Sequence, residues 1–232
     1  MTTGKKSLAI APVCPGPSSQ RCEGCTGCTG YSNHEAEHPS PVITVIGGIN
    51  PRHQHGVEYD TADLVILTKV LGSDLGAGPM AFDARHNGAI SKAMAAHDFQ
   101  GTVGEHLAVE VPAIEPGGRP RHIVVVGLGK ADDISRRRMC ALFNYSMALA
   151  SEYKARSILI PVFPQRSSGA VLNLRGTGAV LRCLVDQKAK SGTINELKEV
   201  RLLCAPQAKQ HLEQGVAVDH TLCNECHIPK LV

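Results

Sequence analysis

The chain has 232 residues, with 24 basic and 21 acidic side chains and a formal net charge of +3. This balance argues against a nucleic-acid partner or an anionic membrane surface as the main ligand. No segment approaches the ~20 apolar residues that span a bilayer, and Pro12 interrupts the short apolar run near the N-terminus. We therefore expect a cytoplasmic protein without a signal peptide or membrane segment.

Composition divides the chain into three segments. Residues 1–41 are rich in Pro, Gly, Ser, Thr and Cys, which is typical of a tail or a metal-organised loop rather than a hydrophobic core. Residues 42–205 alternate short apolar runs with helical patterns and are predicted to form the folded domain. Residues 206–232 are predicted to hold a linker-like helix and a Cys-containing C-terminal tail.

Six short segments have the composition of β-strands. Several are continuous apolar runs, as expected of central strands that are covered on both faces. The predicted strands are Val42–Ile46, Asp63–Thr68, His106–Pro112, His122–Leu128, Ser157–Phe163 and Val200–Cys204.

Four segments between or after these strands have helical periodicity. Ser135 is predicted to be the N-cap of the second of them. The alternation of strands and helices predicts an α/β, three-layer fold, with a mostly parallel or mixed central sheet of about six strands flanked by helices. The predicted helices are Asn87–His97, Ser135–Lys154, Gly176–Lys190 and a segment from Gln207 through Leu212 towards His220.

Five short motifs occur in a fixed order along the folded segment: Ala62–Thr68, Gly88–Lys92, Asp98–Gly101, Gly104-Glu105 and Gly127–Asp132. Together they resemble the N-terminal domain of the M17 leucyl aminopeptidases, over about residues 42–205. The resemblance implies a macro-domain-like fold, with a mixed sheet between helices.

The C-terminal segment resembles the linker helix that leads into the catalytic domain of that family. The sequence Leu222-Cys223-Asn224-Glu225 occupies the end of this helix, followed by Cys226 where the family has proline. In the family, the lysine and the carboxylates that hold two divalent metals lie beyond this point. The resemblance therefore implies no catalytic residue in this chain.

Nine cysteines are present, an odd number, and most lie near the two ends. The Cys-x-x-Cys-x-x-Cys spacing places thiolates so that they can share one ion, which suits zinc or an iron–sulfur cluster. The alternative is a reduced, disordered tail. The candidate metal ligands are Cys14, Cys22, Cys25, Cys28, Cys223, Cys226 and His227.

The C-terminal part of this set, Cys223-x-x-Cys226-His227, also matches the attachment motif of haem c. Haem attachment requires export, and the expected cytoplasmic location argues against it. The remaining cysteines, Cys140, Cys183 and Cys204, lie in apolar periodic segments and are expected to be small core side chains.

Two glycine-containing segments are candidate ligand loops. The first follows a predicted strand and precedes a helix, where phosphate can bind, but it lacks the third glycine of a dinucleotide fingerprint, which favours a structural turn. The second lies where ADP-ribose-binding macro domains have a glycine-rich loop, but without their asparagine. The candidate residues are Gly127, Gly129 and Lys130 in the first segment and Gly76 and Gly78 in the second.

These observations lead to three hypotheses of function. The first is a non-catalytic, stand-alone domain that acts as an assembly, regulatory or scaffold subunit, through a protein partner or self-association, with a Cys-ligated zinc or iron–sulfur site. The second is a part of a leucyl aminopeptidase whose catalytic domain is absent from this chain. The third is a redox or iron–sulfur accessory subunit.

Overall fold

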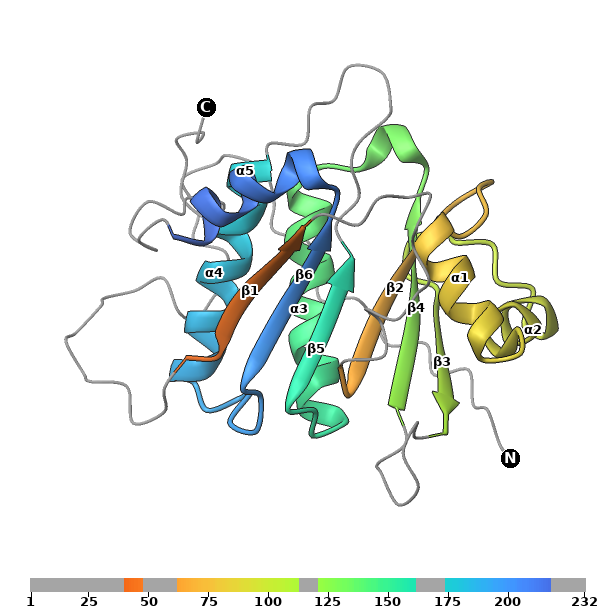
Figure 1. Cartoon of the computed structure of the whole chain (residues 1–232), viewed down its shortest axis with the longest axis horizontal. Coiled ribbons are helices and arrows are strands. Elements are labelled where there is room, and N and C mark those ends of the chain that lie inside the picture. The colour runs from red at the N-terminus through yellow and green to blue at the C-terminus, as the bar shows by residue number, and fades with distance from the viewer. Residues whose placement is uncertain (1–39, 48–61, 113–120, 162–173, 218–232) are drawn as a thin grey trace.

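The computed structural model describes residues 40–47, 62–112, 121–161 and 174–217, and within them a six-stranded mixed sheet (Figure 1). The strand order is β1-β6-β5-β2-β4-β3, and every neighbouring pair is parallel except β3 with β4. All six predicted strands are confirmed. They are β1 (Val42–Gly47), β2 (Leu64–Val70), β3 (His106–Val111), β4 (Arg121–Gly129), β5 (Ser157–Pro161) and β6 (Glu199–Cys204).

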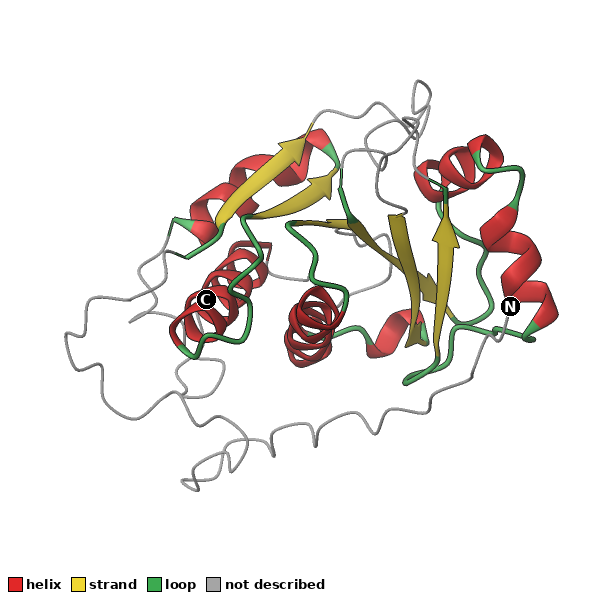
Figure 2. Cartoon of the chain, turned by 90° about the horizontal axis from the view of Figure 1, so that it is seen from below, coloured by secondary structure: helices red, strands yellow, loops and turns green. Residues whose placement is uncertain are grey.

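Helices cover both faces of the sheet and give the predicted three layers (Figure 2). They are α1 (Ala77–Arg85), α2 (Ala89–Ala96), the short 3-10 turn η2 (Ala131–Asp133), α3 (Arg136–Glu152), α4 (Leu174–Lys190) and α5 (Pro206–Val216). The strand β2 lies between two cores, which explains its continuous apolar run. Leu64 and Ile66 enter the core under α3, α4 and α5, whereas Val65 and Leu67 enter the core under α1 and α2.

The helix α1 was not predicted from the sequence. Its sequence begins Ala-Gly-Pro, which favours a loop, but Pro79 lies in the first turn, where a missing N–H costs little. Asp83 near its end caps the next helix, because its carboxylate accepts hydrogen bonds from the N–H groups of Ile90 (2.7 Å) and Ser91 (3.1 Å). This contact joins α1 and α2 into one unit.

The other helices agree with the sequence predictions. In α2, Ile90 is fully buried, and Ala93 and Met94 pack against the same core. Ser135 is the N-cap of α3, as predicted, and its side chain accepts a hydrogen bond from the Arg138 N–H at 3.3 Å. The helix α5 ends at Val216, within the segment expected to continue towards His220.

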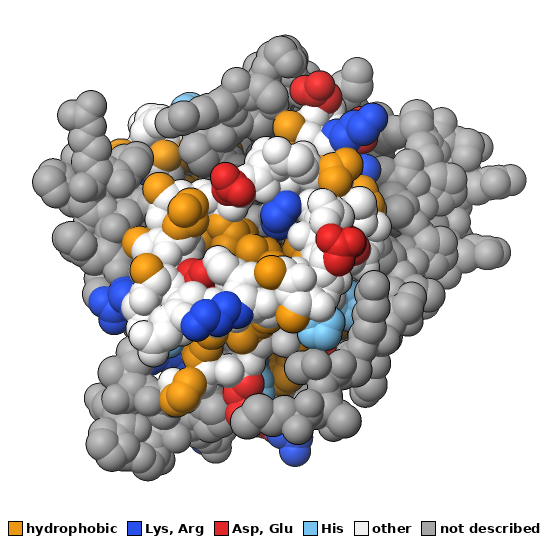
Figure 3. Space-filling view, turned by 90° about the vertical axis from the view of Figure 1, so that its right-hand side faces the viewer, with side chains coloured by type: hydrophobic (Ala, Val, Ile, Leu, Met, Phe, Trp, Pro, Cys, Tyr) orange, Lys and Arg blue, Asp and Glu red, His pale blue; other side chains and the backbone are white. Residues whose placement is uncertain are grey.

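Helices also lie beside the two edge strands. The helix α2 lies alongside β3 at one edge of the sheet, and α5 contacts β1 at the other (Figures 1 and 2). On the side where α1 and α2 lie, acidic, basic and hydrophobic side chains are interspersed (Figure 3). This distribution agrees with the balanced charge of the sequence.

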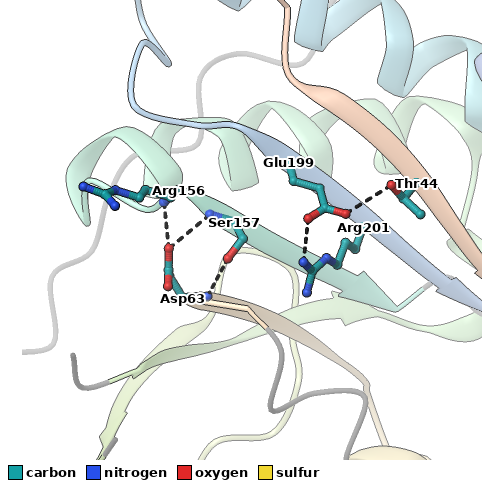
Figure 4. A network of polar contacts seen from close by, with 6 residues as sticks. All are labelled: Thr44, Asp63, Arg156, Ser157, Glu199 and Arg201. Atoms are coloured by element: carbon teal, nitrogen blue, oxygen red, sulfur yellow. Dashed lines mark hydrogen bonds and ion pairs between the residues drawn. The ribbon is translucent and has the colours of Figure 1, made fainter. Parts of the chain in front are cut away.

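Hydrogen bonds from polar side chains join the amino ends of neighbouring parallel strands (Figure 4). The Asp63 carboxylate accepts hydrogen bonds from the N–H groups of Arg156 (2.9 Å) and Ser157 (3.2 Å), and the Ser157 hydroxyl accepts one from the Asp63 N–H (3.0 Å). Nearby, Glu199 pairs with Arg201 at 2.5 Å and accepts a hydrogen bond from Thr44 at 3.1 Å. These contacts fix the register of β2 with β5 and of β1 with β6.

The substitution Asp63→Ala should lower the free energy of unfolding by about 0.5–1.5 kcal/mol, because it removes the acceptor of two backbone hydrogen bonds, one exposed and one partly buried. Urea denaturation followed by circular dichroism would measure this change. The exposed Asp74 provides a matched control, and Asp74→Ala should change the stability little. Equal effects of the two substitutions would contradict a structural role for Asp63.

No helix in the four described ranges is long and apolar enough to cross a membrane.

Candidate functional site

Ligands of open α/β sheets bind at the carboxyl ends of the strands. In the described part of the chain, one loop packs on this end of the sheet. This signature loop, residues 98–105, connects α2 to β3 and lies across the end of β4. Gly127 N–H donates to the Glu105 carbonyl and Gly129 N–H donates to the Gly101 carbonyl, both at 2.9 Å. The Gly129 carbonyl in turn accepts a hydrogen bond from Leu71 N–H, also at 2.9 Å. The loop is thereby bonded to the end of β4, which is itself bonded to the residue that follows β2.

Two glycines are required for this close approach. A Cβ atom at Gly127 would lie 2.0 Å from the Thr102 carbonyl oxygen, so no side chain fits there. Gly101 has a φ of +88°, in the left-handed region, and a Cβ atom there would lie 3.0 Å from the Lys69 carbonyl oxygen. The glycines of the sequence motif therefore allow backbone to pack directly on backbone.

The Glu105 side chain bonds to the backbone of its own loop. One carboxylate oxygen, Oε2, accepts hydrogen bonds from the N–H groups of Gly101 and Thr102, both at 2.7 Å. Burial on its own would raise the pKa of Glu105. Hydrogen bonds from Thr102, Gly101 and Gln100 outweigh burial and hold the pKa below the ordinary value of 4.5. The carboxylate is therefore the stable form in the folded protein.

Two basic side chains donate hydrogen bonds to carbonyl groups at the same end of the sheet. Lys69 at the end of β2 donates through Nζ to the Gln100 carbonyl at 2.8 Å. Arg138 in the first turn of α3 donates through Nη1 to the Leu128 carbonyl at 2.6 Å. Lys69 therefore binds the signature loop to β2, whereas Arg138 binds α3 to the end of β4 beside the loop.

This geometry changes the interpretation of the candidate ligand loops. The N–H groups of Gly127 and Gly129 are already bonded to the signature loop, so a phosphate could use them only by displacing that loop. Lys130 is exposed and lies at the N-cap of η2. In the second candidate segment, Gly76 is the N-cap of α1 and Gly78 is buried within that helix, so the segment is the start of a helix rather than a loop. Its role in binding a ligand stays a prediction.

The structural role of the Glu105 side chain was not predicted from the sequence. The feature of the sequence that could have indicated this role is the position of Glu105, four residues after Gly101 and three after Thr102. From there its carboxylate can reach back to both N–H groups. The spacing alone does not show that the intervening backbone turns back on itself. This turn includes the Glu105 N–H bond to the Thr102 carbonyl at 3.1 Å.

The cysteine predictions are resolved only in part. Cys204 is buried, and Cys140 and Cys183 are half-buried, which agrees with packed thiols. Burial raises the pKa of Cys204 to about 11, so its thiol stays protonated. Within the described ranges, no three His, Cys, Asp or Glu side chains group as metal ligands. The seven predicted ligands lie outside those ranges: Cys14, Cys22, Cys25, Cys28, Cys223, Cys226 and His227.

The lowered pKa of Glu105 predicts a loss of stability in acid. The pKa is below 4.5 in the folded protein, so the carboxylate stabilises the fold above the unfolded pKa and loses this effect as the pH falls through the folded value. Thermal denaturation between pH 3 and pH 7 would measure it. The variant Glu105→Gln should show a smaller drop below about pH 4.5 than the wild type. An unchanged pH profile would contradict the role of this carboxylate.

The mixed six-stranded sheet, its helices on both faces and the loop at its carboxyl edge define a macro-like α/β domain. Residues 70–193, more than half of the chain, match the model of the cytosol aminopeptidase family, N-terminal domain. The chain therefore belongs to this family and contains its N-terminal domain. Comparison with curated protein sequences gives no match.

Solved structures show the same fold at low sequence identity. A tomato leucine aminopeptidase mutant is 17% identical, with a TM-score of 0.53 over 79% of this chain and 37% of that chain. A Trypanosoma brucei macrodomain in complex with ADP is 15% identical, with a TM-score of 0.51 over 75% of this chain and 69% of that chain. This chain thus covers just over a third of the tomato enzyme.

Proposed function

We propose that the chain acts as a non-catalytic assembly or regulatory module in the cytoplasm, built on the N-terminal domain of the aminopeptidase family. The proposal rests on what the residues of the family motif do in the structure. The Gly101 and Thr102 N–H groups donate to the Glu105 carboxylate, and the Gly127 and Gly129 N–H groups donate to the backbone carbonyls of Glu105 and Gly101. These groups stabilise the fold, which is the role expected of a module that acts through its surface.

Incubation of the purified chain with a leucyl chromogenic substrate and Mn²⁺ tests the non-catalytic role. We expect no turnover above the rate without protein. A full-length leucyl aminopeptidase under the same conditions provides the positive control. Metal-dependent turnover by this chain alone would contradict the proposal.

The likeness to the tomato enzyme favours a second candidate function. It extends over 79% of this chain, so the chain could be the N-terminal part of an aminopeptidase whose catalytic domain is supplied separately. The tagged chain would then co-purify from its own cells with leucyl-hydrolysing activity. Purification without that activity favours the first function.

We also propose that the terminal cysteines hold a metal centre, zinc or an iron–sulfur cluster. This part of the proposal rests on the density of thiols at residues 14–28 and 223–226. Metal analysis with a visible spectrum distinguishes the two, because zinc is colourless and iron–sulfur clusters absorb visible light. A redox accessory role requires the iron–sulfur result. A metal-free, colourless protein purified without oxygen or chelators would contradict the metal centre.

A further inference from the structure

We propose that the backbone of the signature loop is an oxyanion-binding site that the Glu105 carboxylate occupies in cis. The N–H groups of Gly101 and Thr102 are consecutive and point to the same carboxylate oxygen, each at 2.7 Å. Consecutive N–H groups that converge in this way form nests that bind carboxylates and phosphates. In this chain the anion that fills the nest is a side chain of the loop itself.

Two basic side chains and two exposed residues lie at or beside the signature loop. Lys69 Nζ lies 2.8 Å from the Gln100 carbonyl, so its positive charge is at the loop. The Arg138 guanidinium lies at Gly129 on the other side, within 3.0 Å of where a Cβ atom of Gly129 would be. Thr102 and Val103 are exposed, so an external group can approach the loop.

Competition with the tethered carboxylate sets the class of ligand. A tethered group acts at an effective concentration of the order of millimolar or more, so a simple anion at low millimolar concentration should not displace Glu105. A phosphate group, or the carboxylate of another molecule, would need additional contacts at the loop to displace Glu105. Removal of the Glu105 carboxylate should open the nest to small anions.

Nuclear magnetic resonance of the Gly101 and Thr102 amides tests the site directly. We would titrate wild type, Glu105→Ala and the control Glu196→Ala, which removes an exposed glutamate outside the loop, with inorganic phosphate and with acetate at constant ionic strength in chloride. We expect saturable shifts of both amides in Glu105→Ala, and at least about tenfold weaker binding in the wild type and the control. Shifts by phosphate alone identify a phosphate site, and shifts by both anions a general oxyanion site.

Thermal denaturation covers the case in which Glu105→Ala does not form the loop. An anion that binds only the folded state raises its stability, so 50 mM phosphate or acetate should raise the melting temperature of this variant by roughly 2–4 °C relative to chloride. Neither a shift nor a rescue with either anion would overturn the proposal. An equal response of Glu196→Ala, or of the wild type, would also overturn it. These results do not depend on turnover, so they leave the non-catalytic role to its own test.

Discussion

The substitution Gly127→Ala should destabilise the protein by at least about 2 kcal/mol, because the added methyl group overpacks a closed contact. Its Cβ atom would lie 2.0 Å from the Thr102 carbonyl oxygen and 2.7 Å from the Gly101 carbonyl carbon. These neighbours are backbone atoms of the signature loop, so the loop must move to make room. Its movement would break the hydrogen bonds from Gly127 and Gly129 as well. Urea denaturation followed by circular dichroism measures the change.

Gly76 provides the control for this substitution. A Cβ atom at Gly76 would have only the Pro79 Cδ atom nearby, at 3.8 Å, and the residue has an ordinary φ of −61°. Gly76→Ala should therefore cost less than about 1 kcal/mol, which is the preference for glycine over alanine at an N-cap. If Gly127→Ala were equally mild, the signature loop would not be packed on β4 as the structure shows.

The second large effect is expected at the contact between α4 and α5. Gly215→Ala should destabilise the protein by about 1–3 kcal/mol, because its Cβ atom would lie 2.0 Å from the Arg175 carbonyl oxygen. Alanine is the better helix former by about 1 kcal/mol, so helix propensity alone predicts the opposite sign. Gly178 faces the same contact from α4, where a Cβ atom would lie 2.5 Å from the Leu212 carbonyl oxygen.

The neighbouring Gln214 is exposed and provides the matched control. Gln214→Ala should leave the stability nearly unchanged. The stability of both variants can be compared by thermal denaturation at neutral pH. A stabilised Gly215→Ala would contradict the close packing of α5 on α4 and would leave α5 as a mobile linker.

The sheet was predictable from the sequence because its strands are apolar on both faces. The alternate residues of Leu64–Leu67 enter two separate cores, and only a central strand of a three-layer fold needs such a run. Periodicity did not specify that β3 is antiparallel to β4, because strand direction depends on the path of the connecting chain. The resemblance to the aminopeptidase N-terminal domain supplied the mixed sheet.

The structure was less predictable where local and tertiary preferences differ. Gly76 and Gly78 are typical of a loop, but α1 forms because Pro79 is tolerated in its first turn and Phe82 is fully buried. Likewise, the close approach of Gly127 to the Thr102 carbonyl depends on two segments that are distant in sequence. The motif was recognisable, but its role as a contact between backbones required the fold.

Hydrogen exchange of the Gly127 and Gly129 amides tests most directly whether the family motif builds the fold. Both amides donate to carbonyls of the signature loop, so they are protected only while that loop is closed. We predict that they exchange with an opening free energy close to that of global unfolding, as core amides do. Exchange at the rate of an open loop, while the amides of β2 remain protected, would show that the signature loop is not a stable part of the fold.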